Sequence, residues 1–207
     1  MGFEYFQEYR PLSLSKQPAL SHNLEELKTS VAQCHLCALA KSRKNVIFGA
    51  GNLKAKVMFI GDNPGVSEDE SGMLFTGKSG EMLANMIEKV LLLSKEEVYV
   101  TTILKCKTPD NRVPTPEEVA CCKPYVMQQI QTIRPQIIVA LGSTSFHHLT
   151  GEYDTPIDKI RGSVLNFGEA KLIPTFHPSF LLRNPSAKKE AYADMLLIKS
   201  LLDELKS

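Results

Sequence analysis

The sequence predicts an α/β protein in which a parallel sheet carries helices on both of its faces. Short apolar runs alternate along the chain with segments of helical periodicity, and this alternation is typical of strands joined by crossover helices. The runs are largely continuous rather than alternating apolar with polar, as expected for strands that are covered on both sides. They occupy residues 57–60, 98–103, 137–141 and 172–175.

Length and charge limit the remaining possibilities. The chain has 207 residues, which suffices for one well-formed core, and we expect an N-terminal arm at residues 1–20 followed by one domain at residues 21–207. A net charge of +1 gives no global basic field, so any contact with nucleic acid has to come from local patches. No apolar run is long enough to span a membrane, and the charged N-terminus is not a secretory signal. We expect a cytoplasmic monomer without a membrane partner.

The first half of the chain is organised around one loop. Asn23 is placed to cap a helix, with Glu26 three residues later, and this helix leads to a pair of cysteines. The strand at 57–60 then runs into the glycine-rich, polar segment 61–80, and an amphipathic helix leaves that segment at about 78–93. Because open α/β sheets bind ligands at the carboxyl ends of their strands, this loop is the candidate active site.

The second half repeats the pattern. After the strand at 98–103, a proline-containing loop reaches Thr115, which forms a capping box with Glu118 at the start of a helix that continues to about Arg134. We expect a kink in that helix at Pro124. The strand at 137–141 leads to a short helix, and residues 150–171 form loops or a hairpin. A long helix follows the last strand, with Ala191, Met195, Ile198 and Leu202 on one face.

Polar side chains follow each predicted strand. Asp62 and Asn63 come after the first strand, Thr102 ends the second, and Ser143 and His177 follow the third and fourth. In a parallel sheet these positions meet at one edge, where a carboxylate, an amide and an imidazole can orient a water and stabilise a leaving anion. The structural alternative is that Asp62 and Asn63 only form a turn and cap a helix.

The segment Gly72–Ser79 satisfies the phosphate-binding pattern G-x-x-x-x-G-K-[ST]. That pattern requires a strand directly before its first glycine. Here the preceding residues 67–71 are acidic and unlike a strand, so the context disfavours a nucleoside triphosphatase. The triphosphatase stays as an alternative that predicts ATP binding lost on Lys78→Ala.

Five cysteines in a chain of this class favour a metal site over disulfides. Cys34 and Cys37 form a C-x-x-C pair, and Cys106 and Cys122 lie further along the chain. Four thiolates suit either a tetrahedral zinc or a [4Fe–4S] cluster, and the single C-x-x-C favours the cluster. Cys121 could take the place of Cys122, and inert buried thiols are the structural alternative.

Several motifs in one order resemble family 4 uracil-DNA glycosylases, the iron–sulfur branch of that superfamily. The motifs span residues 23–205 and read C-x-x-C, G-x-x-P-G-x-x-E-D, G-x-x-F-x-G-x-x-G, K-C-K-x-P-x-N-R-x-P and F-H-P-S-x-L-L-R. The resemblance implies a three-layer α/β/α sandwich around a four-stranded parallel sheet. It also implies a [4Fe–4S] cluster on Cys34, Cys37, Cys106 and Cys122, and hydrolysis of the N-glycosidic bond of a damaged base in DNA.

The resemblance also implies roles for single residues. Phe75 matches the aromatic that stacks on a flipped base, and His177 matches the histidine that stabilises the leaving base anion. Gly61 and Gly65 flank the motif that lets the backbone approach the base. The segment of Ser179, Leu181, Leu182 and Arg183 matches the loop that enters the duplex, and Arg112 belongs to a basic patch that could contact DNA.

Two positions depart from the family's pattern. The family usually has G-E-A-P-G where this chain has Gly61-Asp62-Asn63-Pro64-Gly65. Asn63 resembles instead the asparagine that orients water in related G-x-N-P-G enzymes, so we favour Asn63 as the water-positioning residue, with Asp62 as the rival. The family's uracil-reading asparagine is Thr102 here, which offers one hydroxyl.

These departures leave three readings of the function. The first is a monofunctional DNA glycosylase that acts on uracil in base-excision repair with water as the nucleophile. Lys78 and Lys105 keep a Schiff-base route open. The second reading is the same scaffold acting on hypoxanthine or xanthine, and the third is a non-catalytic iron–sulfur protein that binds damaged DNA.

Overall fold

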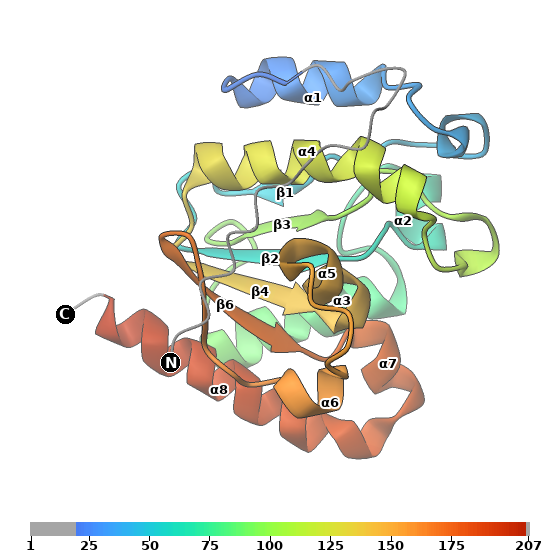
Figure 1. Ribbon diagram of the computed structural model, residues 1–207. Helices are drawn as coiled ribbons and strands as arrows, with labels where there is room; N and C mark the ends of the chain where they lie inside the picture. The colour runs from blue at the N-terminus through green and yellow to red at the C-terminus, as the bar shows by residue number, and fades with distance from the viewer. Residues whose placement is uncertain (1–19, 206–207) are drawn as a thin grey trace.

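A six-stranded mixed sheet forms the centre of the computed structural model, which describes residues 20–205 (Figure 1). The strands follow the order β1-β3-β2-β4-β6-β5, and the four in the middle run parallel. Each edge carries one short antiparallel strand. The predicted parallel sheet is therefore confirmed, whereas the predicted strand number of four is too small by the two edge strands.

The strands and helices have these bounds. The strands are β1 (Ala50–Gly51), β2 (Val57–Gly61), β3 (Tyr99–Thr102), β4 (Ile137–Leu141), β5 (Leu165–Phe167) and β6 (Ala170–Thr175). The α-helices are α1 (Leu24–Ala32), α2 (Val66–Ser71), α3 (Gly77–Met86), α4 (Pro116–Ile133), α5 (Gly142–Thr150), α6 (Ile157–Ile160), α7 (Pro178–Arg183) and α8 (Lys188–Glu204). A π-helical segment, Ile87–Leu91, extends α3.

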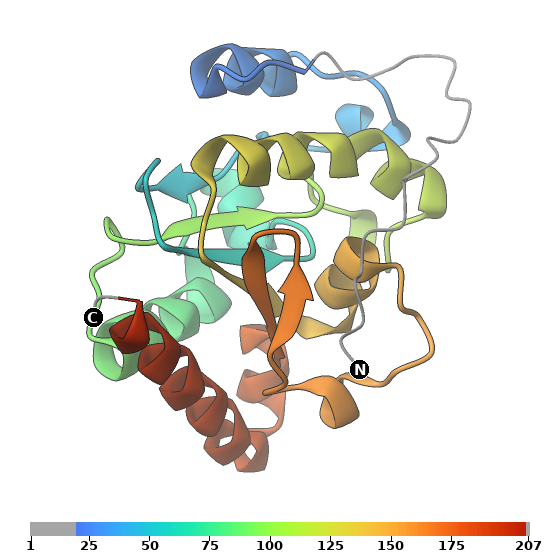
Figure 2. The same ribbon diagram turned by 60° about the vertical axis from the view of Figure 1, so that its left-hand side comes forward.

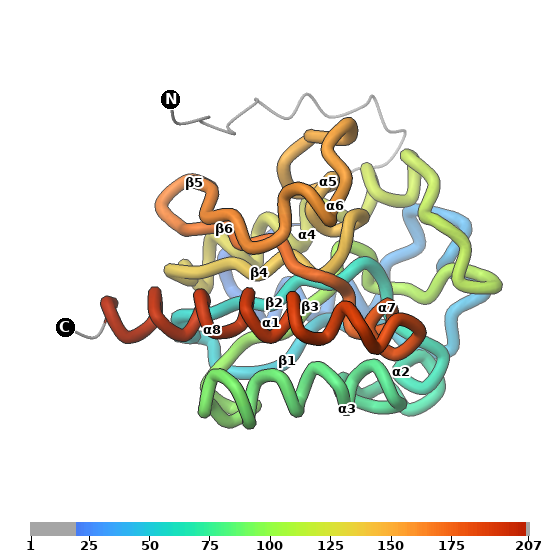
Figure 3. Tube along the Cα trace, turned by 90° about the horizontal axis from the view of Figure 1, so that it is seen from below, coloured from blue at the N-terminus to red at the C-terminus, as the bar shows by residue number. Residues whose placement is uncertain are grey.

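Helices cover both faces of the sheet and produce three layers. Side chains alternate along a strand, so Met58 and Ile60 of β2 pack on one face with α1, α4 and α5, while Val57 and Phe59 pack on the other with α3 and α8. Figure 2 shows α1 and α4 on the opposite side of the sheet from α8, and Figure 3, seen from below, shows α8 and α3 side by side on the viewer's side of the sheet. The predicted α/β/α sandwich is confirmed.

Capping residues fix the starts of the helices on the α1–α4 face. The Asn23 side chain accepts hydrogen bonds from the backbone N–H groups of Glu25 and Glu26, which confirms the predicted cap of α1. Thr115 and Glu118 form the predicted reciprocal capping box at the start of α4. That helix runs as a single element from Pro116 to Ile133 with Pro124 inside it.

Two segments predicted as loops contain helices. Residues 66–71 form α2 within the glycine-rich segment, and residues 178–183 form α7 before the closing helix α8. Both are only six residues long, too short for a periodic apolar pattern to reveal them. Between Leu20 and Leu205, no helix is long and apolar enough to cross a bilayer. Except for Leu20, the predicted N-terminal arm lies outside the described residues.

Candidate active site

A cavity of about 490 Å³ opens at the carboxyl ends of the parallel strands. Its lining includes Gly61 at the end of β2 and Asp62 directly after it, Thr102 at the end of β3, Leu141 at the end of β4, and His177 after β6. The predicted meeting of these strand ends at one edge is thus confirmed for all four strands. Ser143 is not among the lining residues and lies in the first turn of α5.

Asp62 places an unpartnered carboxylate oxygen in this region. Its Oδ1 is buried and is the one buried side-chain nitrogen or oxygen within residues 20–205 that has no hydrogen-bond partner. Burial raises the pKa of Asp62, and the charge of His177 lowers it by a smaller amount. Asn63 is engaged differently, because its Nδ2 donates to the Pro64 carbonyl at 3.0 Å. Both residues line the cavity.

The hydrogen bonds of His177 define its tautomer. The backbone N–H of Ser179 donates to His177 Nδ1 at 3.2 Å, and the Ser179 hydroxyl lies 2.7 Å from the same nitrogen, so the backbone contact favours Nδ1 as the acceptor of the ring. In the neutral ring the proton is then on Nε2. This nitrogen lies close to Gly61, since a Cβ added to Gly61 would be 3.7 Å from it. Gly142 permits this approach, since it has φ +86° and a Cβ there would lie 3.0 Å from the His177 Cβ and 3.7 Å from the Asp62 Oδ1.

Thr102 does not present a free hydroxyl to the cavity. Its Oγ1 donates to the Leu104 carbonyl at 2.5 Å, and the residue is buried. The Cγ2 methyl group faces Gly61 instead, 3.5 Å from where a Cβ would stand. The predicted base-binding residue therefore lines the cavity with a methyl group, and its one hydrogen is committed to the backbone.

The glycine-rich segment is built on two acidic anchors. The Glu68 carboxylate accepts from the Gly65 N–H at 2.9 Å and fixes the start of α2. The buried Asp69 carboxylate accepts from the N–H groups of Lys44 and Asn45, at 3.0 and 3.2 Å. Because α2 separates β2 from the next glycines, no strand precedes Gly72–Ser79, and the structure contradicts the triphosphatase alternative.

Phe75 lies beside the cavity rather than in its lining. Its neighbours Leu74 and Thr76 line the cavity, whereas the Phe75 ring packs on the α3–α8 side and lies 5.5 Å from the Lys95 Nζ. The residue has φ 63°, a strained conformation for a side chain of this size. The backbone of Phe75 packs directly on Gly80, and only a glycine allows this, because a Cβ at Gly80 would lie 2.4 Å from the Phe75 backbone.

The segment predicted to enter DNA forms α7 and divides into two faces. Ser179 and Arg183 line the cavity, and Leu182 is exposed. Leu181 is buried in the core at 1 % exposure, so its predicted contact with DNA is wrong for this arrangement of the chain. The reason is helical geometry: consecutive residues on a helix face different directions, and only one of the two leucines can point outward.

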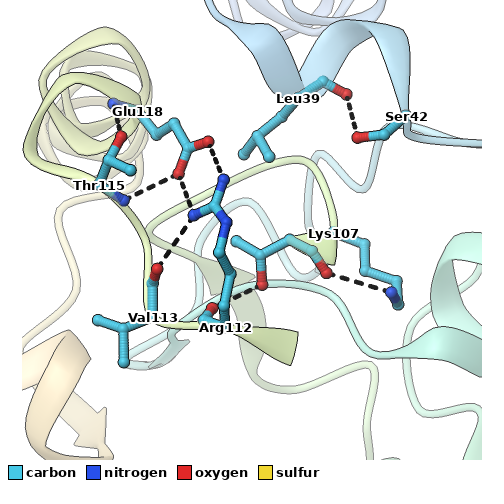
Figure 4. A network of polar contacts seen from close by, with 8 residues as sticks. Leu39, Ser42, Lys107, Arg112, Val113, Thr115 and Glu118 are labelled. Carbon is cyan, nitrogen blue, oxygen red and sulfur yellow. Dashed lines mark hydrogen bonds and ion pairs between the residues drawn. The ribbon is translucent and has the colours of Figure 1, made fainter. Parts of the chain in front are cut away.

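Arg112 was also predicted to contact DNA, and the structure gives its guanidinium another partner. Its two terminal nitrogens donate to the buried Glu118 carboxylate at 2.9 and 2.6 Å (Figure 4). These hydrogen bonds hold the pKa of Glu118 below its ordinary value. Nη1 also donates to the Val113 carbonyl at 3.0 Å. Arg112 therefore clamps the loop between β3 and α4 to the start of α4.

The clamped loop carries a cavity residue that sequence reasoning missed. Asn111 lines the cavity and is exposed, with φ 54°, and Asp110 beside it has φ 50°. Two successive left-handed residues without glycine are strained and need support from the surrounding structure. The available signal was the motif that contains Asn111 and Arg112, from which only the arginine was chosen as a site residue.

The cysteines surround a second, smaller cavity. Its lining includes Cys34, Cys37, Cys106, Cys121 and Cys122. Arg43 Nη1 donates to Cys106 Sγ at 3.3 Å, and the Lys105 N–H donates to Cys122 Sγ at 3.2 Å. Burial raises the pKa of Cys122 to about 12 and also raises that of Cys106. No group of three or more His, Cys, Asp or Glu side chains in the described part of the chain is placed to hold a metal ion.

Comparison with known proteins gives one consistent result. The family model of the uracil DNA glycosylase superfamily matches residues 48–198. The chain is 40% identical over 164 residues to a type-4 uracil-DNA glycosylase of Thermotoga maritima, covering 79% of this chain and 85% of that protein. It is 37% identical over 187 residues to a type-4 uracil-DNA glycosylase of Saccharolobus solfataricus, covering 87% of each.

Proposed function

Because the chain belongs to the uracil DNA glycosylase superfamily, and within it to the type-4 enzymes, we propose that it removes uracil from DNA in base-excision repair. The reaction is hydrolysis by a monofunctional enzyme. A water oxygen bonds to the anomeric carbon of the deoxyribose, the bond to the base nitrogen breaks, and the base leaves with the electron pair. The water loses one proton, and the departing base anion gains one from the solvent. The observation that carries the proposal is that Asp62, which has a carboxylate oxygen without a partner, and His177 line the same cavity.

Asp62 is the residue we assign to the water. Its free Oδ1 can accept a hydrogen bond from a water and orient the lone pair of that water toward the sugar. Asn63 was the favoured candidate on sequence grounds and is kept as the rival, because the hydrogen bond from its amide nitrogen to the Pro64 carbonyl leaves its Oδ1 available as an acceptor. Asn111 adds a second amide at the cavity and can complete the hydrogen bonding of the water or of the base.

His177 is assigned to the leaving base. As negative charge develops on the base, the Nε2–H group beside Gly61 can donate a hydrogen bond to it. The Ser179 N–H holds Nδ1 as an acceptor, so the required tautomer is set before the substrate binds. No transfer of a proton from Asp62 to His177 is needed for this role.

The cavity mouth fits an extruded nucleotide. A base in a duplex must leave the stack to be reached, and Leu182 is the exposed apolar side chain that can fill the vacated space. Lys78, Arg183 and Ser179 line the same cavity and can contact backbone phosphates. The Lys105 ammonium is buried and bonded to three acceptors, which argues against a Schiff base on it. Stacking of the base on Phe75 requires its ring to turn from Lys95 toward the cavity.

Cys34, Cys37, Cys106 and Cys122 are the residues we assign to a [4Fe–4S] cluster. The donor set fits: four sulfurs line one cavity, and N–H groups point at two of them, as is usual for cluster sulfurs. Cys121 Sγ faces the Leu36 carbonyl at 3.6 Å and behaves as a thiol donor, so it is not assigned. A bound cluster would supply a structural centre that ties α1, the β3–α4 loop and α4 together. Zinc on the same sulfurs is the alternative.

The experiment is base release from end-labelled oligonucleotides carrying uracil, hypoxanthine or xanthine, in single and double strands, followed by alkaline cleavage of abasic sites. We expect cutting at uracil. Cutting only at a purine would replace the substrate assignment, and binding without cutting would contradict the enzyme assignment. Iron and sulfide analysis with absorption near 400 nm tests the cluster, and stoichiometric zinc in a colourless protein would contradict it.

A further inference from the structure

Lys105 is a fully buried lysine between the two cavities. The residue is 1 % exposed, and its Nζ lies 2.6 Å from Thr101 Oγ1, 2.8 Å from the Thr102 carbonyl and 2.7 Å from Gln129 Oε1. All three partners are themselves buried. A lysine in this position is unusual, because burying a charge is costly unless an opposite charge or a full set of hydrogen bonds compensates for it.

The hydrogen-bond pattern is suited to the charged form of Lys105. The Gln129 amide is oriented by its Nε2, which donates to the Phe48 carbonyl at 2.9 Å and to the Tyr99 hydroxyl at 3.0 Å, so Oε1 must face Lys105 as an acceptor. The Thr101 hydroxyl donates its one hydrogen to the Phe48 carbonyl or to Gln129 Oε1, and its oxygen accepts from Lys105 Nζ. The three donors of an ammonium group match these three acceptors.

The compensating negative charge lies at the cysteines. No ion pair found within residues 20–205 involves Lys105. Lys105 lines the second cavity together with Cys106 and Cys122. Its own backbone N–H donates to Cys122 Sγ, and Cys106 is the next residue along the chain. Four thiolates around a cluster carry net negative charge, so the loaded centre is the counter-charge that the fold provides.

The other side of the same segment supports the active-site loop. In the parallel register, Thr102 pairs with Gly61 of β2. Beyond it, the N–H groups of Ile103 and Leu104 donate to the Gly61 and Asp62 carbonyls, each at 2.9 Å. The Lys105 ammonium donates to the Thr102 carbonyl at 2.8 Å. Residues 102–105 therefore join the cysteine centre, meaning the four assigned cysteines, to the backbone of Asp62.

We propose that Lys105 is a positioning residue that couples the cysteine centre to the active site. Its ammonium is the buried counter-cation of the centre, and its three hydrogen bonds hold the end of β3 on which the Gly61–Asp62 backbone is registered. This inference rests on the proposed function, since it requires a cluster and a measurable reaction. Loss of the ammonium therefore changes two separable quantities, the electronic environment of the cluster and the geometry at Asp62.

The decisive variant is Lys105→Met in the iron-loaded protein, compared with wild type at equal iron content. Methionine keeps the length and the backbone N–H but removes the charge. We expect a more negative reduction potential of the cluster, because a nearby buried cation no longer favours the added electron. We also expect single-turnover uracil release to slow by about tenfold to a hundredfold from misplacement of Asp62.

Lys107→Met is the matched control, because Lys107 lies on the other side of Cys106 in the chain and is half-buried. Its Nζ donates to the Thr108 carbonyl at 3.1 Å. Its reduction potential should stay close to that of wild type. An unchanged potential and rate in Lys105→Met, with only its stability lowered, would overturn the inference and leave a structural lysine.

Thr101→Val keeps the inference testable if Lys105→Met does not fold. It retains the ammonium and the shape of the strand residue but removes one acceptor, so we expect slower uracil release at an unchanged potential. A wild-type rate in Thr101→Val would overturn the positioning role. Wild-type protein without iron or without uracil release would instead overturn the proposed function, and the inference with it, so the two failures are distinguishable.

Discussion

At the scale of single residues, Asp62 combines a functional assignment with a cost in stability. A buried carboxylate oxygen without a partner destabilises the folded protein. Asp62→Asn keeps the shape of the side chain without the charge. We predict that it raises the free energy of unfolding by about 1 kcal/mol at neutral pH relative to wild type. The same variant should lose about a hundredfold or more in single-turnover uracil release. Chemical denaturation and base release measure the two effects.

The pH dependence of that stability gain follows from the raised pKa of Asp62. Above the folded-state pKa, wild type bears the full cost of the buried charge, so the advantage of Asp62→Asn is complete there. The advantage should decline as the pH falls through the folded-state pKa toward the ordinary value of 3.8, where both proteins are neutral at this position. Asn63→Ala is the control. If it loses more activity than Asp62→Asn, the role of orienting the water belongs to Asn63.

Thr102 gives a second prediction at this scale. Because its hydroxyl hydrogen is committed to the Leu104 carbonyl, we expect Thr102→Val to change the rate of uracil release by less than about threefold. The lost hydrogen bond should lower the free energy of unfolding by about 1 kcal/mol. Steady-state kinetics and denaturation test this pair of outcomes. A rate that collapses while stability holds would mean that the hydroxyl turns to read the base.

At the scale of structural elements, the loop between β3 and α4 depends on the Arg112–Glu118 clamp. If Arg112 acts by holding this loop, then Arg112→Gln and Glu118→Gln should slow uracil release by similar factors, because each breaks the same contact and loosens Asn111. The double variant should be no slower than either single variant, since paired groups are not additive. Thermal melting of the four proteins should show the same pattern.

The salt dependence of DNA binding separates this role from a phosphate contact. A phosphate contact made by Arg112 would lower the slope of binding against salt by about 1 in Arg112→Gln alone and leave Glu118→Gln unaffected. Arg183→Gln is the positive control, because Arg183 lines the active-site cavity and is our candidate for such a contact. We expect the slope to change for Arg183→Gln and to stay constant for both clamp variants.

At the scale of the whole molecule, the cysteine centre joins segments that are far apart in sequence. Cys34 follows α1, Cys106 lies in the β3–α4 loop and Cys122 lies in α4. We predict that Cys122→Ala loses the bound iron and the absorption near 400 nm, while Cys121→Ala keeps both. The reason is direction: on a helix, Cys122 receives the Lys105 N–H, whereas Cys121 faces the Leu36 carbonyl. Retained iron in Cys122→Ala would exchange the two assignments.

The sequence by itself determined the layers of this protein and the edge of the sheet at which its candidate active site lies. Continuous apolar runs at 57–60 and 137–141 can be satisfied only when both faces of a sheet are covered, and parallel strands bring their carboxyl ends to one edge. That reasoning predicts that Asp62, Thr102 and His177 meet, and all three line one cavity. The capping residues of α1 and α4 were equally predictable, because a cap is a local interaction between neighbours in the chain.

Only the tertiary structure decided which of the candidate side chains are free. Leu181 and Leu182 are the same residue type in adjacent positions, yet packing buries one and exposes the other. Suitable polar groups are also present on Arg112, Thr102 and Asn63, but each of them has a hydrogen-bond partner in the folded chain. These partners depend on the path of the loops, which no sequence pattern reveals. The hydrogen bonds of Lys105 were unpredictable for the same reason, because its acceptors come from two elements, β3 and α4. A pattern gives the type and order of side chains, whereas hydrogen bonding and burial depend on neighbours that folding brings from elsewhere in the chain.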